Sequence, residues 1–267
     1  ITAGELDTAS DRALTVTGST GGAGTLTLNN STYTSSGGHL SMTGTVTIGT
    51  SGVITGVDQL GEGGGTITCT GSPTLGCKRW RQLQTHWTPA TSTLKVEDGS
   101  YAFGNASTYG IPYNFTIDNS GNTNALDAGF TVTNNLTITA GTLTTSGSNH
   151  ALTVTGKTYL GDNSAADSAT LTCNDSAISL GAAYTSDYAF VVVGGGTFAG
   201  GGGAHTIGSI YMQDNANAKV TLTDDVTTIS SEYYSGNVAI NILGTNAVFA
   251  HGSGTVTITF AGTFLNK

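Results

Sequence analysis

Residues 138–156 of the chain read Ile-Thr-Ala-Gly-Thr-Leu-Thr-Thr-Ser-Gly-Ser-Asn-His-Ala-Leu-Thr-Val-Thr-Gly, and residues 1–18 read Ile-Thr-Ala-Gly-Glu-Leu-Asp-Thr-Ala-Ser-Asp-Arg-Ala-Leu-Thr-Val-Thr-Gly. With His150 treated as an insertion, twelve of the eighteen aligned positions are identical. Such self-similarity is the signature of a repeat architecture. The repeat predicts a first half, residues 1–137, and a second half, residues 138–267, each built in the same way.

Short segments in which apolar residues alternate with Thr recur along both halves. They include Leu14–Thr17, Thr25–Leu28, Thr45–Ile48, Thr66–Thr68, Leu136–Thr139 and Thr255–Thr259. Alternation with a period of two places the apolar side chains on one face of a strand and Thr on the other. Thr is also β-branched and therefore favours strands. The chain is predicted to be all-β.

The spacing of these segments favours a parallel arrangement. Consecutive segments are too close together for the helical crossovers of a βαβ sheet. Antiparallel hairpins favour Asn-Gly and Asp-Gly turns, whereas the chain has no Asn-Gly and one Asp-Gly, at Asp98-Gly99. Gly is abundant and supplies the positive φ angles that sharp corners need. These features favour a parallel β-solenoid, or β-helix. Two β-sandwich or jelly-roll domains are the alternative.

Composition and charge exclude several other classes. Gly, Thr and Ser make up about 42% of the 267 residues, and charged residues only 9%, which argues against coiled coils and helical bundles. The formal net charge of −9 is opposite to that of a nucleic-acid-binding surface. The longest apolar run, Ala189–Val193, is far shorter than the roughly 20 residues of a membrane span. We expect neither a nucleic-acid partner nor a membrane span.

Cys69 and Cys77 lie close together in the sequence around a Gly-Ser-Pro turn, while Cys173 has no neighbour of its kind. The spacing allows a disulfide between Cys69 and Cys77 in an oxidising compartment, and three buried free thiols are the alternative. The chain begins inside a repeat, so its N-terminus is expected to be processed or to belong to a longer protein.

One segment differs from the rest in composition. Residues 77–89 contain both tryptophans of the chain and three of its eight basic residues. Trp and Arg are enriched in binding hot spots, and aromatic faces stack on sugar rings. One interpretation is a protruding loop that contacts a glycan, a receptor or a neighbouring subunit; the alternative is a hydrophobic plug over the solenoid interior. The candidate binding residues are Lys78, Arg79, Trp80, Arg81 and Trp87.

No pattern of a catalytic or metal site stands out. The adjacent acids Glu97-Asp98 and Asp224-Asp225 would point to opposite sides of a strand, and the five His residues lack metal-ligand spacing. We therefore expect no catalytic residue, no metal centre and no cofactor. The sequence leaves open a structural calcium ion near Asp162 and Asp167, although the order of the oxygen ligands differs from that of an EF-hand.

The segments Tyr113–Ile117, Thr131–Gly147 and Ala151–Gly156 resemble the Thr/Gly-rich β-helix repeats of phage virion and tail-fibre proteins and of bacterial surface adhesins. The resemblance covers about two-thirds of the chain and fails around residues 70–112. It implies a structural role on a virion or cell surface.

Three functions follow from these observations. The first is a non-catalytic structural or adhesive module of an extracellular fibre or virion surface, which self-associates or joins longer fibre proteins and binds a glycan or receptor. The second is ice binding through Thr ladders, because the chain has sixteen Thr-x-Thr triplets. Their starts, at residues 15, 25, 32, 45 and 66 for example, look too irregular for a uniform ladder. The third is a carbohydrate-active β-helix enzyme.

Overall fold

The structure, a computed structural model, describes residues 1–9, 11–61, 63–99, 102–103, 109–145, 148–163, 168–182, 187–213, 218–230, 238–243, 246–259 and 263–266. It divides into two compact units, unit 1 (Ile1–Tyr101 and Asn105–Thr116) and unit 2 (Ala102–Gly104 and Ile117–Lys267). The sequence repeat indicates a different boundary, after residue 137. That boundary marks where the duplicated sequence starts again, and it stays a prediction.

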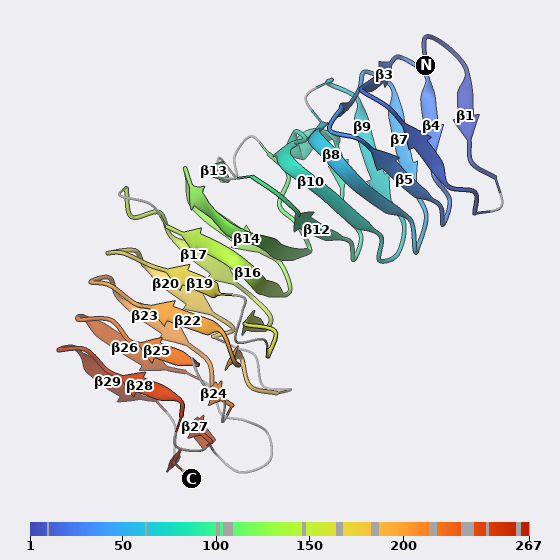
Figure 1. The fold of residues 1–267 in the computed structure, drawn as a ribbon. Helices are drawn as coiled ribbons and strands as arrows, with labels where there is room; N and C mark the ends of the chain where they lie inside the picture. Colours follow the sequence, from blue (N-terminus) through green and yellow to red (C-terminus); the bar gives the residue numbers. More distant parts are fainter. Residues whose placement is uncertain are drawn as a thin grey trace. The chain divides into compact units, whose positions relative to one another are not determined.

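Each unit is a parallel β-solenoid, in which the chain winds through three parallel sheets in a fixed order, here called faces 1, 2 and 3 (Figure 1). The strand pairings within the described part of the chain are parallel, apart from one isolated antiparallel bridge between Leu83 and Tyr109. The predicted fold is confirmed. The alternative of sandwich or jelly-roll domains is wrong, because those folds are built from antiparallel sheets.

In unit 1, face 1 consists of β1 (Glu5–Asp7), β4 (Thr25–Thr27), β7 (Thr45–Ile48), β9 (Thr66–Cys69) and β11 (Trp87–Thr88). Faces 2 and 3 consist of β2 (Leu14–Val16), β3 (Thr20–Gly22), β5 (Thr32–Ser35), β6 (His39–Met42), β8 (Val53–Gly61), β10 (Thr74–Arg81) and β12 (Thr93–Val96). The strands β8 and β10 each run from face 2 into face 3. A short 3-10 helix, η1 (Gln84–His86), precedes β11.

In unit 2, the strand β13 (Ala102–Phe103) pairs with the end of β14 (Asn114–Leu126), whose start belongs to unit 1. Face 2 consists of β15 (Phe130–Val132), β17 (Leu152–Val154), β20 (Ile178–Leu180), β23 (His205–Ile207), β26 (Val226–Ile229) and β29 (Thr255–Ile258). Face 3 consists of the start of β16 (Leu136–Thr144), β18 (Thr158–Leu160), β21 (Phe190–Val192), β24 (Ile210–Met212), β27 (Val238–Ile242) and β30 (Thr263–Asn266). Face 1 consists of the end of β16, β19 (Ala169–Thr172), β22 (Gly196–Ala199), β25 (Lys219–Thr221) and β28 (Val248–Ala250).

The alternation read from the sequence sets the core. On face 1 of unit 1, Leu26 and Val46 are at most 1% exposed, whereas the Thr residues on either side of them are half-buried. The corners are narrow: a side chain at Gly44 would collide with the backbone carbonyl of Gly24 one coil earlier, so only Gly fits there. Apolar rows therefore fill the interior, and rows of hydroxyl-bearing side chains face outward.

Both copies of the sequence repeat occupy the same part of a coil. Glu5–Asp7 and the end of β16 lie on face 1, and each is followed by a Leu-Thr-Val strand on face 2, β2 in unit 1 and β17 in unit 2. The shared sequence thus corresponds to a shared structural position.

Candidate functional site

The two tryptophans of the segment 77–89 are core residues. Trp80 continues the inward row of Leu40 and Leu60 on face 3, and Trp87 follows Ile67 on face 1. Each Trp is 8% exposed, and the two rings pack edge to face with centroids 4.8 Å apart. The prediction of a protruding loop is wrong, because most of the segment forms β10, η1 and β11. The burial of both tryptophans agrees with the alternative interpretation, in which the segment is a hydrophobic plug over the solenoid interior.

Hydrogen bonds hold both indole rings in place. The indole Nε1 of Trp80 donates to the carbonyl oxygen of Gly110 at 3.1 Å, and that of Trp87 donates to the carbonyl oxygen of Ile111 at 3.2 Å. A buried indole needs such an acceptor. The ring faces are therefore used in packing and offer little surface to a ligand.

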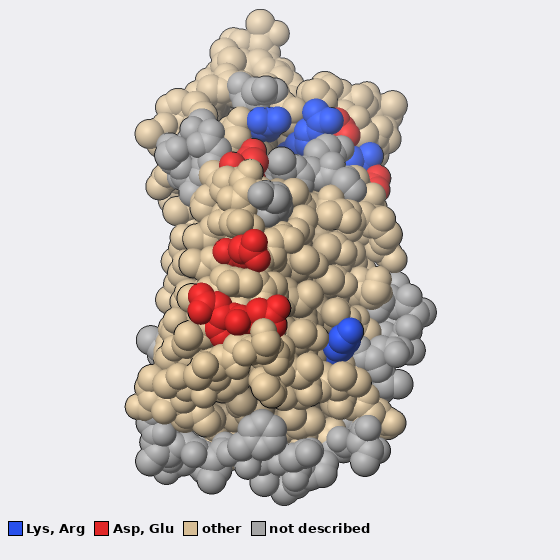
Figure 2. All heavy atoms as spheres, turned by 90° about the vertical axis from the view of Figure 1, so that its left-hand side faces the viewer, with Lys and Arg blue, Asp and Glu red and all other residues tan. Residues whose placement is uncertain are grey.

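The basic residues of the segment lie among acidic and aromatic partners. The Nζ of Lys78 lies 3.1 Å from Asp98 Oδ2 and 3.9 Å from Asp58 Oδ1, and His39 Nε2 lies 3.5 Å from Asp58 Oδ2. The hydrogen bond from Lys78 holds the pKa of Asp98 below its usual value. In the upper part of the surface drawn in Figure 2, Lys and Arg side chains likewise lie beside acidic ones.

Arg81 and Arg79 differ in their surroundings. Arg81 Nη1 donates to the hydroxyl of Tyr109 at 2.7 Å, and its guanidinium carbon lies 5.4 Å from the centre of the Tyr109 ring. Arg79 is exposed. Ligand binding through Lys78, Arg79 and Arg81 stays a prediction, whereas Trp80 and Trp87 could reach a ligand only through a rearrangement of the core.

The three cysteines are free and buried. The disulfide between Cys69 and Cys77 that the spacing allowed is not formed, and the alternative of buried thiols describes the structure. Burial raises the pKa of Cys69 to about 12 and raises the pKa of Cys77 and Cys173 further. Thiols are nucleophilic as thiolates, so these side chains are poor nucleophiles at neutral pH.

The acidic candidates are dispersed over several turns. Asp162 is exposed in the turn after β18, and Asp167 lies outside the described residues. Asp224 accepts hydrogen bonds from Ser253 N at 2.9 Å and from Ser253 Oγ at 3.1 Å, which lower its pKa. Asp224 thereby stabilises the corner of the next coil, at Ser253. Within the described ranges, no group of three or more His, Cys, Asp or Glu residues could hold a metal ion.

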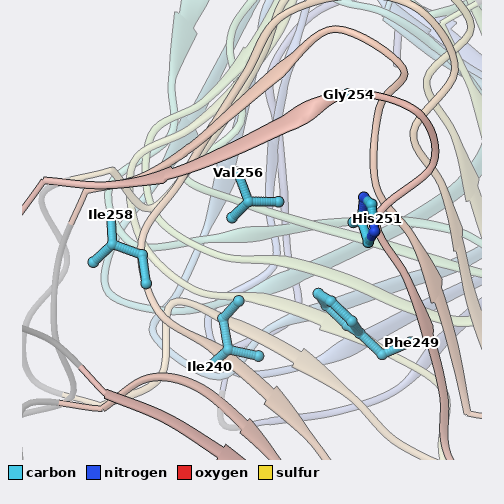
Figure 3. A pocket seen from close by; sticks show the side chains of 6 residues that line it. All are labelled: Ile240, Phe249, His251, Gly254, Val256 and Ile258. Carbon is cyan, nitrogen blue, oxygen red and sulfur yellow. The ribbon is translucent and has the colours of Figure 1, made fainter.

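A cavity of about 430 Å³ lies in unit 2, lined by Ile240, Phe249, His251, Gly254, Val256 and Ile258 (Figure 3). Val256 and Ile258 continue the inward row of Thr227 and Ile229 on face 2. The cavity therefore lies at the end of the apolar interior and opens to solvent there, since His251 and Ile258 are exposed. Its lining is apolar except for His251 and offers no paired acid and base.

The most regular outward surface is a ladder of Thr residues on face 1 of unit 1. Three Thr-x-Thr triplets lie side by side in register on β4, β7 and β9, and all six Thr side chains are half-buried. We call this surface the Thr ladder: Thr25, Thr27, Thr45, Thr47, Thr66 and Thr68.

Sequence reasoning missed this ladder because triplets of different faces alternate along the chain. The triplets that begin with Thr15 and Thr32 start in β2 and β5, on face 2. Those that begin with Thr25, Thr45 and Thr66 share face 1 and are almost evenly spaced along the chain, one in each coil. Sorting the triplets by the length of one coil would have revealed the ladder.

Unit 2 has a longer ladder with a single column of hydroxyl groups. One outward residue from each strand of face 2 lies in register with the next: Thr131, Thr153, Ser179, Thr206, Thr228 and Thr257. We call this row the hydroxyl column. Neighbouring strands are about 4.8 Å apart, so the hydroxyl groups repeat at that interval.

The fold and these surfaces define the chain as a parallel β-solenoid with ordered rows of outward hydroxyl groups. No protein family, curated protein or solved structure matches it. Within the described residues, no helix has the length and apolar character that a membrane span requires.

Proposed function

We propose that the chain is a non-catalytic structural and adhesive module of an extracellular fibre or virion surface. The observation that carries this proposal is the hydroxyl column, together with the Thr ladder. An array of identical polar groups at a fixed interval binds a repetitive ligand, such as a surface polymer, at many points at once. Multivalent contact gives useful avidity even when each contact is weak.

The wider setting belongs to the same proposal. The chain acts outside the cell, associates with copies of itself or with longer fibre proteins, and contacts a glycan or receptor. The net charge of −9 suits a neutral or basic ligand better than an acidic polymer. Nucleic acid is not a partner.

Binding and turnover assays on the same polysaccharide panel test this function. The proposal predicts saturable binding to a surface polymer without release of new reducing ends. Sustained release of reducing ends that Asp224→Ala or Asp225→Ala abolishes would contradict it and support the carbohydrate-active enzyme. Imaging of the native particle would show whether the chain belongs to a filament or capsid surface.

The Thr ladder supports a second candidate function, ice binding. Its rungs are about 4.8 Å apart and the two Thr of one strand about 6.7 Å apart, a two-dimensional repeat comparable in scale to that of an ice surface. Thr side chains have restricted χ1 angles, so the methyl and hydroxyl groups are ordered before binding. The six Thr of the ladder are uncharged, whereas the adjoining rung on β1 carries Glu5 and Asp7, and Thr27 Oγ1 donates to Glu5 Oε1 at 2.8 Å.

Thermal hysteresis measurements distinguish this second candidate from the first. Thr47→Lys places a charge in the centre of the ladder and should abolish hysteresis. The matched control, Thr206→Lys, changes the hydroxyl column on another face and should leave hysteresis intact. A wild-type chain without hysteresis at high concentration, or equal effects of the two substitutions, would exclude ice binding through the ladder.

A further inference from the structure

A row of aromatic and apolar side chains lies on the outer side of face 3 in unit 2. Tyr159, Val191, Tyr211 and Asn241 are register partners on the successive strands β18, β21, β24 and β27. The neighbours of Val191 in its strand, Phe190 and Val192, are fully buried in the interior. Because side chains alternate along a strand, the row points away from that interior.

Tyr188 packs onto this row and orders it. Its ring centre lies 4.9 Å from that of Tyr211, at an angle of 31°, and its hydroxyl accepts a hydrogen bond of 2.8 Å from Asn241 Nδ2. Tyr188 is 8% exposed, Val191 5% and Val193 1%, and Tyr159 is partly buried against them. This is a small second apolar cluster outside the solenoid interior.

The segment that carries Tyr188 is itself anchored. Lys157 Nζ donates to Asp187 Oδ2 at 2.5 Å, and the backbone N–H of Tyr188 donates to Asp187 Oδ1 at 2.7 Å. These bonds hold Tyr188 against the row before any ligand arrives, and they place a cation and a carboxylate at the side of the row. Rigid aromatic side chains lose little entropy on binding.

We infer that Tyr159 and Tyr211 form a stacking platform for a neutral pyranose oligosaccharide, an inference that rests on the adhesive function proposed above. Both side chains are half-buried, so part of each ring remains accessible, while Val191 between them and Tyr188 against the Tyr211 ring are almost fully buried. They lie two rungs apart, about 10 Å, which is close to the length of two linked sugar rings. A tyrosine ring has an apolar face and a polar edge, as a pyranose does.

Polar groups around the row favour a sugar over an apolar ligand. The Oδ1 atom of Asn241 is buried and has no hydrogen-bond partner within the described structure. An unpaired buried acceptor is unfavourable, and a sugar hydroxyl that approached after a small local adjustment would donate to it. Lys157 and Asp187 offer a donor and an acceptor on the other side. The narrow row and its polar edge do not suit a large protein interface.

The test measures binding of the full chain to an immobilised panel of neutral pyranose oligosaccharides. Tyr159→Ala and Tyr211→Ala should each weaken binding by roughly tenfold, while Tyr211→Trp should retain it. The matched control is Tyr113→Ala, which removes a half-buried tyrosine of unit 1 and should not affect binding. Melting curves of the variants show whether each remains folded.

The outcomes separate this inference from the proposed function. Wild-type binding that folded Tyr159→Ala and Tyr211→Ala variants retain would overturn the platform and leave the adhesive function standing. Binding to a host surface but to none of the sugars would also overturn the platform, in favour of a protein receptor or a charged glycan. A wild-type chain that binds neither sugars nor surfaces would overturn both.

Discussion

The two units build the same three-faced coil with different regularity. The inward residues on face 1 of unit 1 are almost evenly spaced along the chain: Leu6, Leu26, Val46, Ile67 and Trp87. Those on face 2 of unit 2 are unevenly spaced: Val132, Val154, Leu180, Ile207, Ile229 and Ile258. Strands nevertheless stay in register in both units, because the corners accommodate the additional residues.

The difference appears in the chemistry of face 1. In unit 1 both outward columns are Thr on β4, β7 and β9. In unit 2 two paired Thr rungs, on β16 and β19, are followed by Thr197 and Ala199 and then by Lys219 and Thr221. A parallel solenoid thus keeps its strands in register through coils of unequal length, whereas a uniform outer surface requires a sequence repeat as well.

The largest loss of stability is expected from a substitution in unit 1 at Trp80, the last residue of the described inward row of face 3. Trp80→Ala leaves a large cavity and should lower the free energy of unfolding by about 3–5 kcal/mol. Urea unfolding followed by circular dichroism measures this change. Trp80→Phe is the control and should lose much less; equal stability of Trp80→Ala and wild type would show that the ring is not packed as described.

Unit 2 has a buried histidine whose titration should affect stability. Burial lowers the pKa of His205, which is 1% exposed and packs against Phe198, to about 4 from 6.5, and nearby Asp225 opposes the shift. Below pH 6.5 the unfolded chain takes up a proton that the folded chain excludes. Stability should therefore be complete above pH 6.5 and decrease by roughly 3 kcal/mol as the pH falls towards 4.

Unfolding curves measured across this pH range check the His205 prediction. His205→Leu should remove most of the slope between pH 6.5 and 4, while His39→Leu, at an exposed position of unit 1, should leave it unchanged. A slope that persists in His205→Leu would assign the titration to other groups.

A smaller effect is expected at Glu97, which links coils of unit 1. Its carboxylate oxygens lie 2.9 and 3.0 Å from Thr55 Oγ1, and one of them accepts the backbone N–H of Gly56 at 3.1 Å. The absence of a side chain at Gly76 leaves room for this reach. Glu97 is half-buried, so Glu97→Ala should cost about 1–2 kcal/mol.

The adjacent carboxylate gives the matched control for Glu97. Asp98 is exposed and bonded to Lys78 at the surface, so the melting temperature of Asp98→Ala should equal that of wild type within error. Equal losses from the two substitutions would mean that Glu97 acts only through its charge.

The strand pattern of the sequence was sufficient to predict the parallel solenoid, because alternation and corner chemistry are local properties. The burial of Trp80 could also have been predicted. Trp80 follows Leu60 at the same spacing along the chain at which Leu60 follows Leu40, and that spacing is the length of one coil. Trp87 continues the row of Val46 and Ile67 in a similar way. The enrichment of Trp and Arg in binding hot spots is a rule of composition only. It takes no account of the length of one coil, so it could not place the two tryptophans in the core.

The tyrosine row could not be predicted in the same way. Tyr159, Val191 and Tyr211 are register partners, although the stretch of chain from Tyr159 to Val191 is much longer than the stretch from Val191 to Tyr211. Because the coils differ in length, register partners of this kind cannot be found by searching the sequence with one fixed spacing. Only the pairing of the strands brings these side chains onto one surface.

The account depends most on the register of the outward rows, and an engineered cysteine pair tests it directly. Thr45 and Thr66 are opposite each other on β7 and β9, at a strand spacing of about 4.8 Å that falls within the Cα separation a disulfide tolerates. Thr45→Cys with Thr66→Cys should therefore form a disulfide under mild oxidation. Thr45→Cys with Ile67→Cys, whose side chains point to opposite sides of the sheet, should remain reduced. Preferential cross-linking of the second pair would contradict the register, and with it the Thr ladder.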